Sequence, residues 1–295
     1  MAWGQRALYR EYRAAWEAEQ WQPAAVALER YLAQDPDGRN AEALWFNAAL
    51  AHKFLRDWPK AYELGIEAAA RAKRGIGDPA FWNLGIAATA LGEWATARDA
   101  WAGFGIDVPP GNGEIEADLG MTPVRLDPSG EVVWGRRLCP ARVRILSVPI
   151  LRARRFGEVV LHDGVPSGER VSNGHTYPVF DELKLLRRSE LPSLTVVVEA
   201  PTEDDMDALT DSFADAGFGA ESQRNVRILC RRCSEGSVHH TAHDAEGGVG
   251  VGVGVGQTFW LAAPEPDAIR LLEAWSAANP TTRHWTALEP ATYPP

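Results

Sequence analysis

The chain of 295 residues predicts an α+β protein built from several domains. Three observations predict this class: a helical repeat in the first third, short runs of alternating polarity in the middle, and strand-like and helix-like segments that alternate towards the end. A chain of this length exceeds a typical single domain. We expect helical repeats over residues 1–110, a small β-rich domain over 111–192, and an α+β domain over 193–295.

Composition narrows the class of partner before any motif is considered. Apolar residues make up 45% of the chain and charged residues 24%, and no apolar run approaches the roughly 18 residues of a membrane span. The net charge of −10 disfavours nucleic acid and anionic membranes as partners. No secretory signal is visible at the start, so we expect a cytoplasmic protein. The excess of arginine over lysine, 26 to 4, favours a GC-rich coding sequence of bacterial type.

The N-terminal third carries a repeat marked by a tryptophan and by a small residue three positions after it. The pairs are Trp21 with Ala24, Trp58 with Ala61, and Trp94 with Ala97. The three tryptophans are separated by 37 and 36 residues. Periods in this range predict stacked units, each of which is one supersecondary element.

The third copy has the order aromatic, Leu-Gly, Gly, aromatic, Ala, aromatic. The residues are Phe81, Leu84, Gly85, Gly92, Trp94, Ala97 and Trp101. This order resembles the tetratricopeptide repeat (TPR), and the resemblance covers about residues 4–107. The second copy departs from it, because Ala48-Ala49 replaces Leu-Gly and Gly65 replaces the late aromatic. The resemblance implies antiparallel helices whose concave face binds a peptide or a protein partner, although such helices can also serve only as a scaffold.

The middle of the chain predicts a small antiparallel sheet or barrel. The expected strands are GEVVWGRRL, ARVRILSVPI, FGEVVLHDGV and TYPVFDELKLL, separated by the turn signals DPSG, HDG and SNG. Asp163-Gly164 predicts a tight turn, which is favoured over an acid/base role for His162. Arg142 and Arg144 would share one strand face. A solvated face, or a pairing with acidic helices, explains them better than a nucleic-acid site does, because no exposed aromatics interleave.

The last region contains two matched units of strand, helix and strand. The first comprises TVVVEA, the amphipathic helix TEDDMDALTDSFADAG and NVRILC, and the second comprises TFWLAA, PEPDAIRLLEAWSAAN and RHWTALE. Met206, Leu209 and Phe213 would lie on one face of the first helix. This element order is that of the ferredoxin-like split β-α-β sandwich, a fold that hosts many functions.

The strongest functional signal is a cluster of cysteine and histidine residues in the loop 230–256 between these two units. The candidate ligands are Cys230, Cys233, His239, His240 and His243. Thiolates and imidazoles at short intervals are what a tetrahedral zinc site requires. The spacing resembles a short zinc knuckle, but each later gap differs by one residue and a histidine replaces the last cysteine. Either His239 or His240 can therefore be the third ligand of the predicted zinc site.

Several interpretations of this loop stay open. Four protein ligands would make a structural site, whereas three would leave a position for water and would need a carboxylate base such as Glu235 or Asp244. The run GGVGVGVGVG from Gly247 is also compatible with a plain loop. A redox Cys-x-x-Cys pair is disfavoured because this pair would end a strand and not begin a helix. Cys139 stands apart and should be buried.

The sequence therefore predicts a non-enzymatic, zinc-binding scaffold that engages a protein or peptide through its helical repeats. The alternative is a metal-dependent enzyme, either a hydrolase or a tailoring enzyme, that uses the same cluster with an open coordination position. An adaptor without metal is the third possibility. No membrane contact is expected, and nucleic acid is an unfavoured partner.

Overall fold

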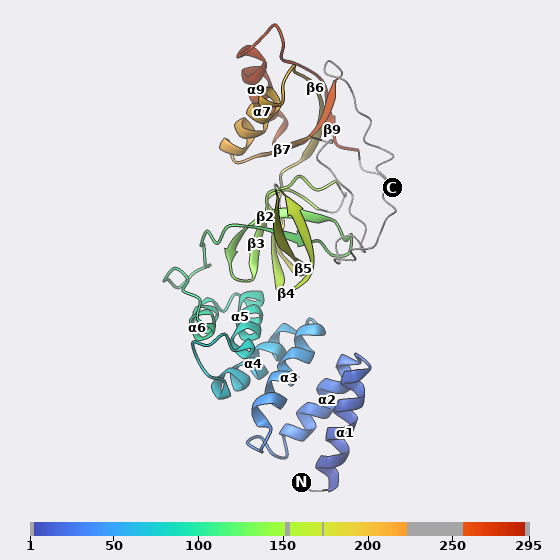
Figure 1. Cartoon of the computed structure of the whole chain (residues 1–295), viewed down its shortest axis with the longest axis vertical. Coiled ribbons are helices and arrows are strands. Elements are labelled where there is room, and N and C mark those ends of the chain that lie inside the picture. Colours follow the sequence, from blue (N-terminus) through green and yellow to red (C-terminus); the bar gives the residue numbers. More distant parts are fainter. Residues whose placement is uncertain (1–2, 151–153, 173, 223–255, 293–295) are drawn as a thin grey trace. The chain divides into compact units, whose positions relative to one another are not determined.

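The computed structural model describes residues 3–150, 154–172, 174–222 and 256–292 (Figure 1). The chain divides into two compact units, Met1–Leu119 with Leu138–Arg142, and Gly120–Arg137 with Val143–Pro295. The first unit is mostly helical and the second is rich in strands, which confirms the predicted α+β class. Among the described helices, none combines the length and the apolar character needed to span a bilayer.

The helical unit contains six described helices in which each one packs on the next. They are α1 (Trp3–Glu17), α2 (Trp21–Leu32), α3 (Ala41–Phe54), α4 (Trp58–Arg71), α5 (Pro79–Leu91) and α6 (Trp94–Phe104). Local sequence signals set their ends. The Asp57 and Asp78 side chains accept hydrogen bonds from the first turns of α4 and α5, and Gly92 ends α5 with a φ of 78°.

Small residues allow these helices to approach closely. Ala24 and Ala97 are fully buried and Ala61 is 3% exposed. A Cβ at Gly85 would lie 2.5 Å from the ring of the buried Trp101, so only glycine leaves room for that ring. The repeated small positions seen in the sequence are thus points of close packing between helices.

A closed barrel of five strands follows, and all of it belongs to the second unit except Leu138–Arg142, which the first unit includes. The strands are β1 (Met121–Arg125), β2 (Val132–Cys139), β3 (Arg142–Ile145), β4 (Val159–Ser172) and β5 (His175–Arg187). β1 pairs with β2 and β4 with β5 in antiparallel fashion, but β1 and β5 close the barrel as a parallel pair, with Val124 opposite Phe180. In a meander of five strands the first and the fifth run in the same direction, so this closing pair is parallel while the β1–β2 and β4–β5 pairs are antiparallel, as expected of an antiparallel barrel.

The predicted tight turn at Asp163-Gly164 is wrong, because β4 continues through both residues. Its pairing with β5 shifts register between His162 and Pro166, as at a β-bulge. The Asp-Gly pair lies at this irregularity within the strand and does not reverse the chain. The strand reversal occurs further on, between Ser172 and His175.

A four-stranded sheet with two helices completes the second unit. Its elements are β6 (Ser193–Glu199), α7 (Glu203–Asp215), β7 (Gly219–Ser222), β8 (Gln257–Ala262), α9 (Glu265–Ala277) and β9 (His284–Pro290). The strand order is β7-β8-β6-β9, and all neighbouring strands are antiparallel. The strand after α7 starts at Gly219, and the segment NVRILC predicted for that role lies outside the described residues.

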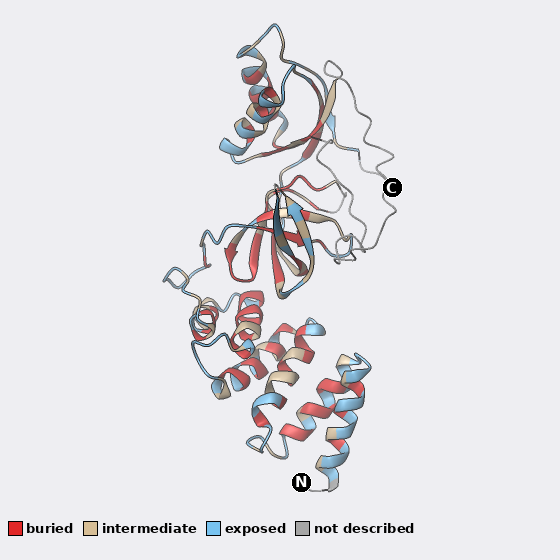
Figure 2. Ribbon diagram, in the orientation of Figure 1, coloured by how far each residue is buried: buried red, intermediate tan, exposed pale blue. Residues whose placement is uncertain are grey.

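The two faces of this sheet bury different cores, and Figure 2 shows how buried and exposed residues are distributed over both units. Phe259 and Leu261 of β8 belong to the core shared with α7 and α9. Their neighbours Trp260 and Ala262 pack instead with Val148 beyond the end of β3. The alternation of β8 therefore joins the sheet to the barrel within the second unit.

Candidate functional site

The five predicted zinc ligands, Cys230, Cys233, His239, His240 and His243, all lie outside the described residues. The same holds for the candidate bases Glu235 and Asp244. Within the described ranges, no group of three or more His, Cys, Asp or Glu side chains is placed to hold a metal ion. The zinc site stays a prediction. The third cysteine, Cys139, is buried as expected, and burial raises the pKa of its thiol.

The helical unit carries a row of half-buried side chains at equivalent positions of α3 and α5, two helices that contact each other. Phe46 corresponds to Trp82 and Asn47 to Asn83, each pair separated by the repeat length. The Trp82 ring meets the Trp101 ring edge to face at 5.3 Å. Aromatic surface and side-chain amides thus recur together along the array.

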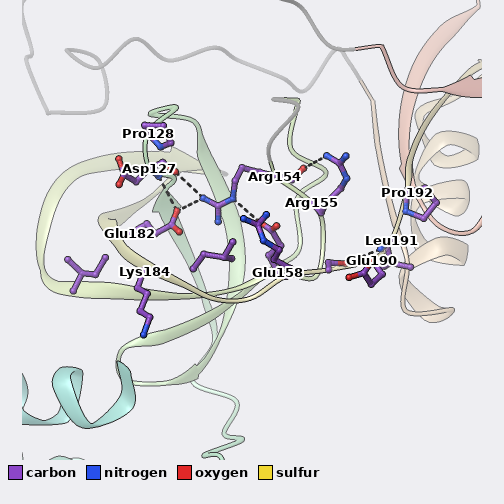
Figure 3. Close-up of a pocket in the computed structure, with 14 residues that line it drawn as sticks. Asp127, Pro128, Arg154, Arg155, Glu158, Glu182, Lys184, Glu190, Leu191 and Pro192 are labelled. Atoms are coloured by element: carbon purple, nitrogen blue, oxygen red, sulfur yellow. Dashed lines mark hydrogen bonds and ion pairs between the residues drawn. The ribbon is translucent and has the colours of Figure 1, made fainter. Parts of the chain in front are cut away.

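A cavity of about 820 Å³ lies in the second unit (Figure 3). It is bounded by the segment after β1, the segment before β4, the end of β5 and the connection to β6. Its charged lining consists of Asp127, Arg154, Arg155, Glu158, Glu182, Lys184, Arg188 and Glu190, and its apolar lining consists of Pro128, Leu183, Leu185, Leu191 and Pro192. Four basic and four acidic side chains therefore surround the same space.

One wall of the cavity is a buried trio of charges. The Arg154 guanidinium lies between two carboxylates, with Nε donating to Glu158 Oε2 at 2.7 Å and Nη1 donating to Glu182 Oε2 at 2.5 Å (Figure 3). The side chains of the three residues are 6%, 1% and 4% exposed, respectively. The backbone N–H of Asp127 donates to the same oxygen of Glu182 at 3.0 Å. Such a network holds the guanidinium in one orientation.

The electrostatics of Arg154 follow from this arrangement. Burial lowers the pKa of its guanidinium, but the hydrogen bonds to Glu182 and Glu158 outweigh burial and leave that pKa raised. Nη1 also donates to the Asp127 carbonyl oxygen at 3.2 Å. Nη2 is buried and has no hydrogen-bond partner among the described residues. Arg154 is therefore permanently charged and retains one unused donor group.

A second perturbed group, Glu221 of β7, lies where the sheet meets the barrel. Burial raises the pKa of its carboxyl to about 7, against the opposing effects of a hydrogen bond from Ser147 and the charge of Arg170. Glu221 is opposite Trp260 in the β7–β8 pair. A carboxyl with this pKa changes its charge near neutral pH, and it does so inside the contact between two layers of the unit.

His162, for which an acid/base role was disfavoured, lies in the core of the barrel unit. It is fully buried, and burial lowers the pKa of its imidazole to about 3. Nδ1 donates to the Asp163 carbonyl oxygen at 2.6 Å, while Nε2 is buried without a hydrogen-bond partner in the described structure. Asp181 of β5 accepts hydrogen bonds from Arg125 and Ser167. His162 is a neutral core residue.

Sequence reasoning missed both the Arg154 trio and Glu221. The only local signal for the trio is the spacing of four residues between Arg154 and Glu158. Glu182 is 28 residues from Arg154, and no pattern in the sequence connects them. Glu221 is an isolated acidic residue in a strand of four residues. Neither position carries a motif.

Comparisons with known proteins add little to this picture. No protein-family model matches the chain, and no curated protein matches it. Among solved structures, the chain is similar to a hypothetical protein from Neisseria gonorrhoeae at 13% sequence identity. The match covers 58% of this chain and 94% of that one with a TM-score of 0.21, a value too low to support an argument.

Proposed function

We propose that the chain is a TPR-type interaction protein of bacterial type, acting in the cytoplasm, whose C-terminal sandwich carries a zinc-binding loop. The observation that carries this proposal is the burial of Ala24, Ala61 and Ala97 at equivalent positions of three successive helix pairs. Small residues at such positions let helices stack into an array with a continuous core. The array supplies the binding surface and the second unit supplies the accessory sites.

The row formed by Phe46, Asn47, Trp82 and Asn83 is the surface we assign to the partner. An amide can donate to and accept from the backbone of an extended peptide, and an aromatic ring offers apolar contact at low entropic cost. Asn47 already donates to the Tyr12 hydroxyl at 2.9 Å, which orders its side chain. The partner of this surface is therefore a peptide segment with both apolar and backbone-bonding character.

The sheet order supports a ferredoxin-like assignment for the C-terminal region, because the first and third strands, β6 and β8, are central. The zinc loop connects β7 and β8, which are adjacent and antiparallel. Closing a long connection costs more conformational entropy than closing a short one. A metal bound by Cys230, Cys233, His243 and either His239 or His240 would shorten the free length of this connection and stabilise the hairpin.

Metal content tests the zinc proposal. Untagged full-length protein should contain about one zinc per chain, because a closed tetrahedral site retains its metal through purification. The Cys230→Ser, Cys233→Ser double variant should contain less than about 0.2 equivalents. The matched control is Cys139→Ser, which alters the cysteine buried in the helical unit. Cys139 is not a predicted ligand, so this variant should contain as much zinc as the wild type. Wild-type protein that lacks zinc before any chelator is added would contradict the proposal.

Peptide selection tests the array. Peptides selected from a random library on the full-length protein should bind about tenfold more weakly to Asn83→Ala, because a hydrogen bond in a desolvated interface contributes about 1 kcal/mol or more. The control is Asn40→Ala, an exposed asparagine at the start of α3 that makes no capping hydrogen bond. Equal binding of all three proteins would remove the assigned surface.

A further inference from the structure

We propose that the peptide group between Asp163 and Gly164 of β4 is a site of covalent modification, at which the aspartate converts to isoaspartate through a five-membered cyclic imide. The site lies in the barrel. It contains none of the residues assigned to the partner surface or to zinc, so it stands or falls independently of the proposed function.

The pair of residues is the first observation. A backbone nitrogen that follows an aspartate can bond to the γ-carbon of that side chain and close a ring of five atoms, and a glycine has no Cβ to obstruct this closure. Asp163 and Gly164 are both half-buried, and the next residue, Val165, is 70% exposed. Water, which opens the imide, therefore reaches this part of the strand.

The irregularity of β4 is the second observation. The strand pairs with β5 up to His162 and again from Pro166, and the register shifts between these two residues. In the described register of the two strands, residues 163–165 have no partner on β5. Regular pairing with β5 therefore does not hold the Asp163-Gly164 peptide group, and its N–H is available for a local contact.

Two hydrogen bonds to this same peptide group are the third observation. The Gly164 N–H donates to Asp163 Oδ1 at 2.7 Å, which places the nitrogen beside the carboxyl group that it would attack. His162 Nδ1 donates to the main-chain carbonyl oxygen of Asp163 at 2.6 Å. A donor at that oxygen withdraws electron density from the amide, so the N–H becomes more acidic and the negative charge that develops during attack is stabilised.

The reaction needs no reagent other than water. In the first step the Gly164 nitrogen bonds to the γ-carbon of Asp163, and one carboxyl oxygen leaves as water with the amide proton and the carboxyl proton. In the second step water adds to one of the two imide carbonyls and breaks its bond to the nitrogen, which regains a proton. Opening at the γ-carbon restores aspartate, whereas opening at the main-chain carbonyl gives isoaspartate of unchanged mass.

Isoaspartate would alter the barrel at this point. The main chain would run through the former side chain of Asp163 and would gain one methylene group between the two segments of β4 that pair with β5. The oxygen that accepts from His162 would belong to a free carboxylate beside a fully buried imidazole. Because a charge in the interior is costly, the modified protein should have a less stable barrel.

Peptide mapping of the full-length protein, incubated at physiological pH and temperature, tests the site. Trypsin releases residues 156–170, which contain Asp163, and residues 31–39, which contain the matched pair Asp37-Gly38. The Asp37 carboxylate pairs with Arg71 at 2.6 Å, and this contact competes with ring closure. Electron-transfer fragmentation, which identifies isoaspartate, should show that it accumulates at least about threefold faster at Asp163 than at Asp37. A smaller ratio, or no isoaspartate at Asp163, would overturn the proposal.

Variants test the ring chemistry. Asp163→Asn should react faster than wild type, because an amide loses ammonia more readily than a carboxylate loses water, and its products carry a carboxyl group in place of the amide. Asp163→Glu keeps the charge but would need a six-membered imide, so residues 156–170 should stay unmodified. The matched control is Asp37→Glu, which should leave the rate at Asp163 unchanged. Modification of residues 156–170 at the wild-type rate in both Asp163 variants would refute the assignment.

Discussion

Each unit of the protein buries an arginine against two glutamates, but the two arrangements differ in where the carboxylates lie. In the helical unit, Arg142 is 1% exposed and donates to Glu114 at 3.0 Å and to Glu116 at 2.9 Å. Those two carboxylate side chains are 46% and 49% exposed. In the second unit, Arg154 is bound by Glu158 and Glu182, which are 1% and 4% exposed.

This difference in the exposure of the carboxylates separates the two arrangements in energy. The Arg142 guanidinium also lies over the Trp94 ring at 5.0 Å, so it pins the segment after α6 to the end of the helical array. Water solvates the carboxylates of Glu114 and Glu116, so replacing Arg142 should lower the free energy of unfolding only modestly. The Arg154 trio is desolvated on all three members and lines a cavity. Only there does the energy of the arrangement depend on every charge being present.

The largest expected effect comes from removing the buried cation of the second unit. Arg154→Met should destabilise that unit by about 3–5 kcal/mol, because it leaves two desolvated carboxylates without their partner. Urea unfolding followed by hydrogen exchange of the barrel amides measures the loss. A change below about 1 kcal/mol would mean that the trio is solvated in solution and would erase the contrast with Arg142.

A smaller effect is expected at Glu221, a half-buried carboxyl of the second unit. Its pKa is raised from 4.5 to about 7, so the folded state keeps a proton that the unfolded state releases above pH 4.5. Stability from this group is complete below pH 4.5 and is lost as the pH rises to about 7. Glu221→Gln should remove this slope and gain about 1–2 kcal/mol over wild type at pH 8, after allowance for partial exposure.

Urea midpoints of wild type and Glu221→Gln between pH 4.5 and pH 8 check this prediction. Asp267→Asn is a suitable control, since that carboxylate pairs with Arg270 at the surface. Parallel profiles for wild type and Glu221→Gln would show that the carboxyl titrates in the ordinary range and is not desolvated by the barrel.

The last effect, similar in size to that of Glu221→Gln and opposite in sign, should follow from removing the cation of the helical unit. Arg142→Met should cost about 1–2 kcal/mol, mainly from the lost contact with Trp94 and the charged hydrogen bonds, because Glu114 and Glu116 stay hydrated. Thermal unfolding followed by far-ultraviolet circular dichroism and by tryptophan fluorescence measures it. If Arg142→Met lost as much unfolding free energy as Arg154→Met, the exposure of the carboxylates would not determine how much stability the arginine contributes.

Local features of the fold followed from residues close in the chain. The tryptophan and alanine spacing placed the helix pairs, and Thr202 with the acidic turn after it marked the start of α7. The segment TFWLAA predicted the strand β8. By contrast, Asp163-Gly164 misled, because its turn chemistry is compatible with a bulge inside β4 and local sequence does not distinguish the two.

The candidate cavity could not be predicted in the same way. Arg142 and Arg154 are both arginines within a basic segment of the sequence, yet their surroundings differ completely. Their partners come from segments before β1 in one case and from β5 in the other. The burial of the carboxylate partners sets the energy of each pair. That burial depends on which elements cover the carboxylates, and neither the composition nor the periodicity of the sequence indicates it.

The sequence by itself determined the α+β class, the helical repeat and the cluster of potential zinc ligands, because period, capping and ligand spacing are properties of neighbouring residues. Tertiary structure alone decided that Glu182 reaches Arg154, that one guanidinium nitrogen stays unpaired, and that Glu221 titrates near neutral pH. Each of these depends on desolvation by residues distant in the chain, and desolvation exists only once the barrel and the sheet have packed.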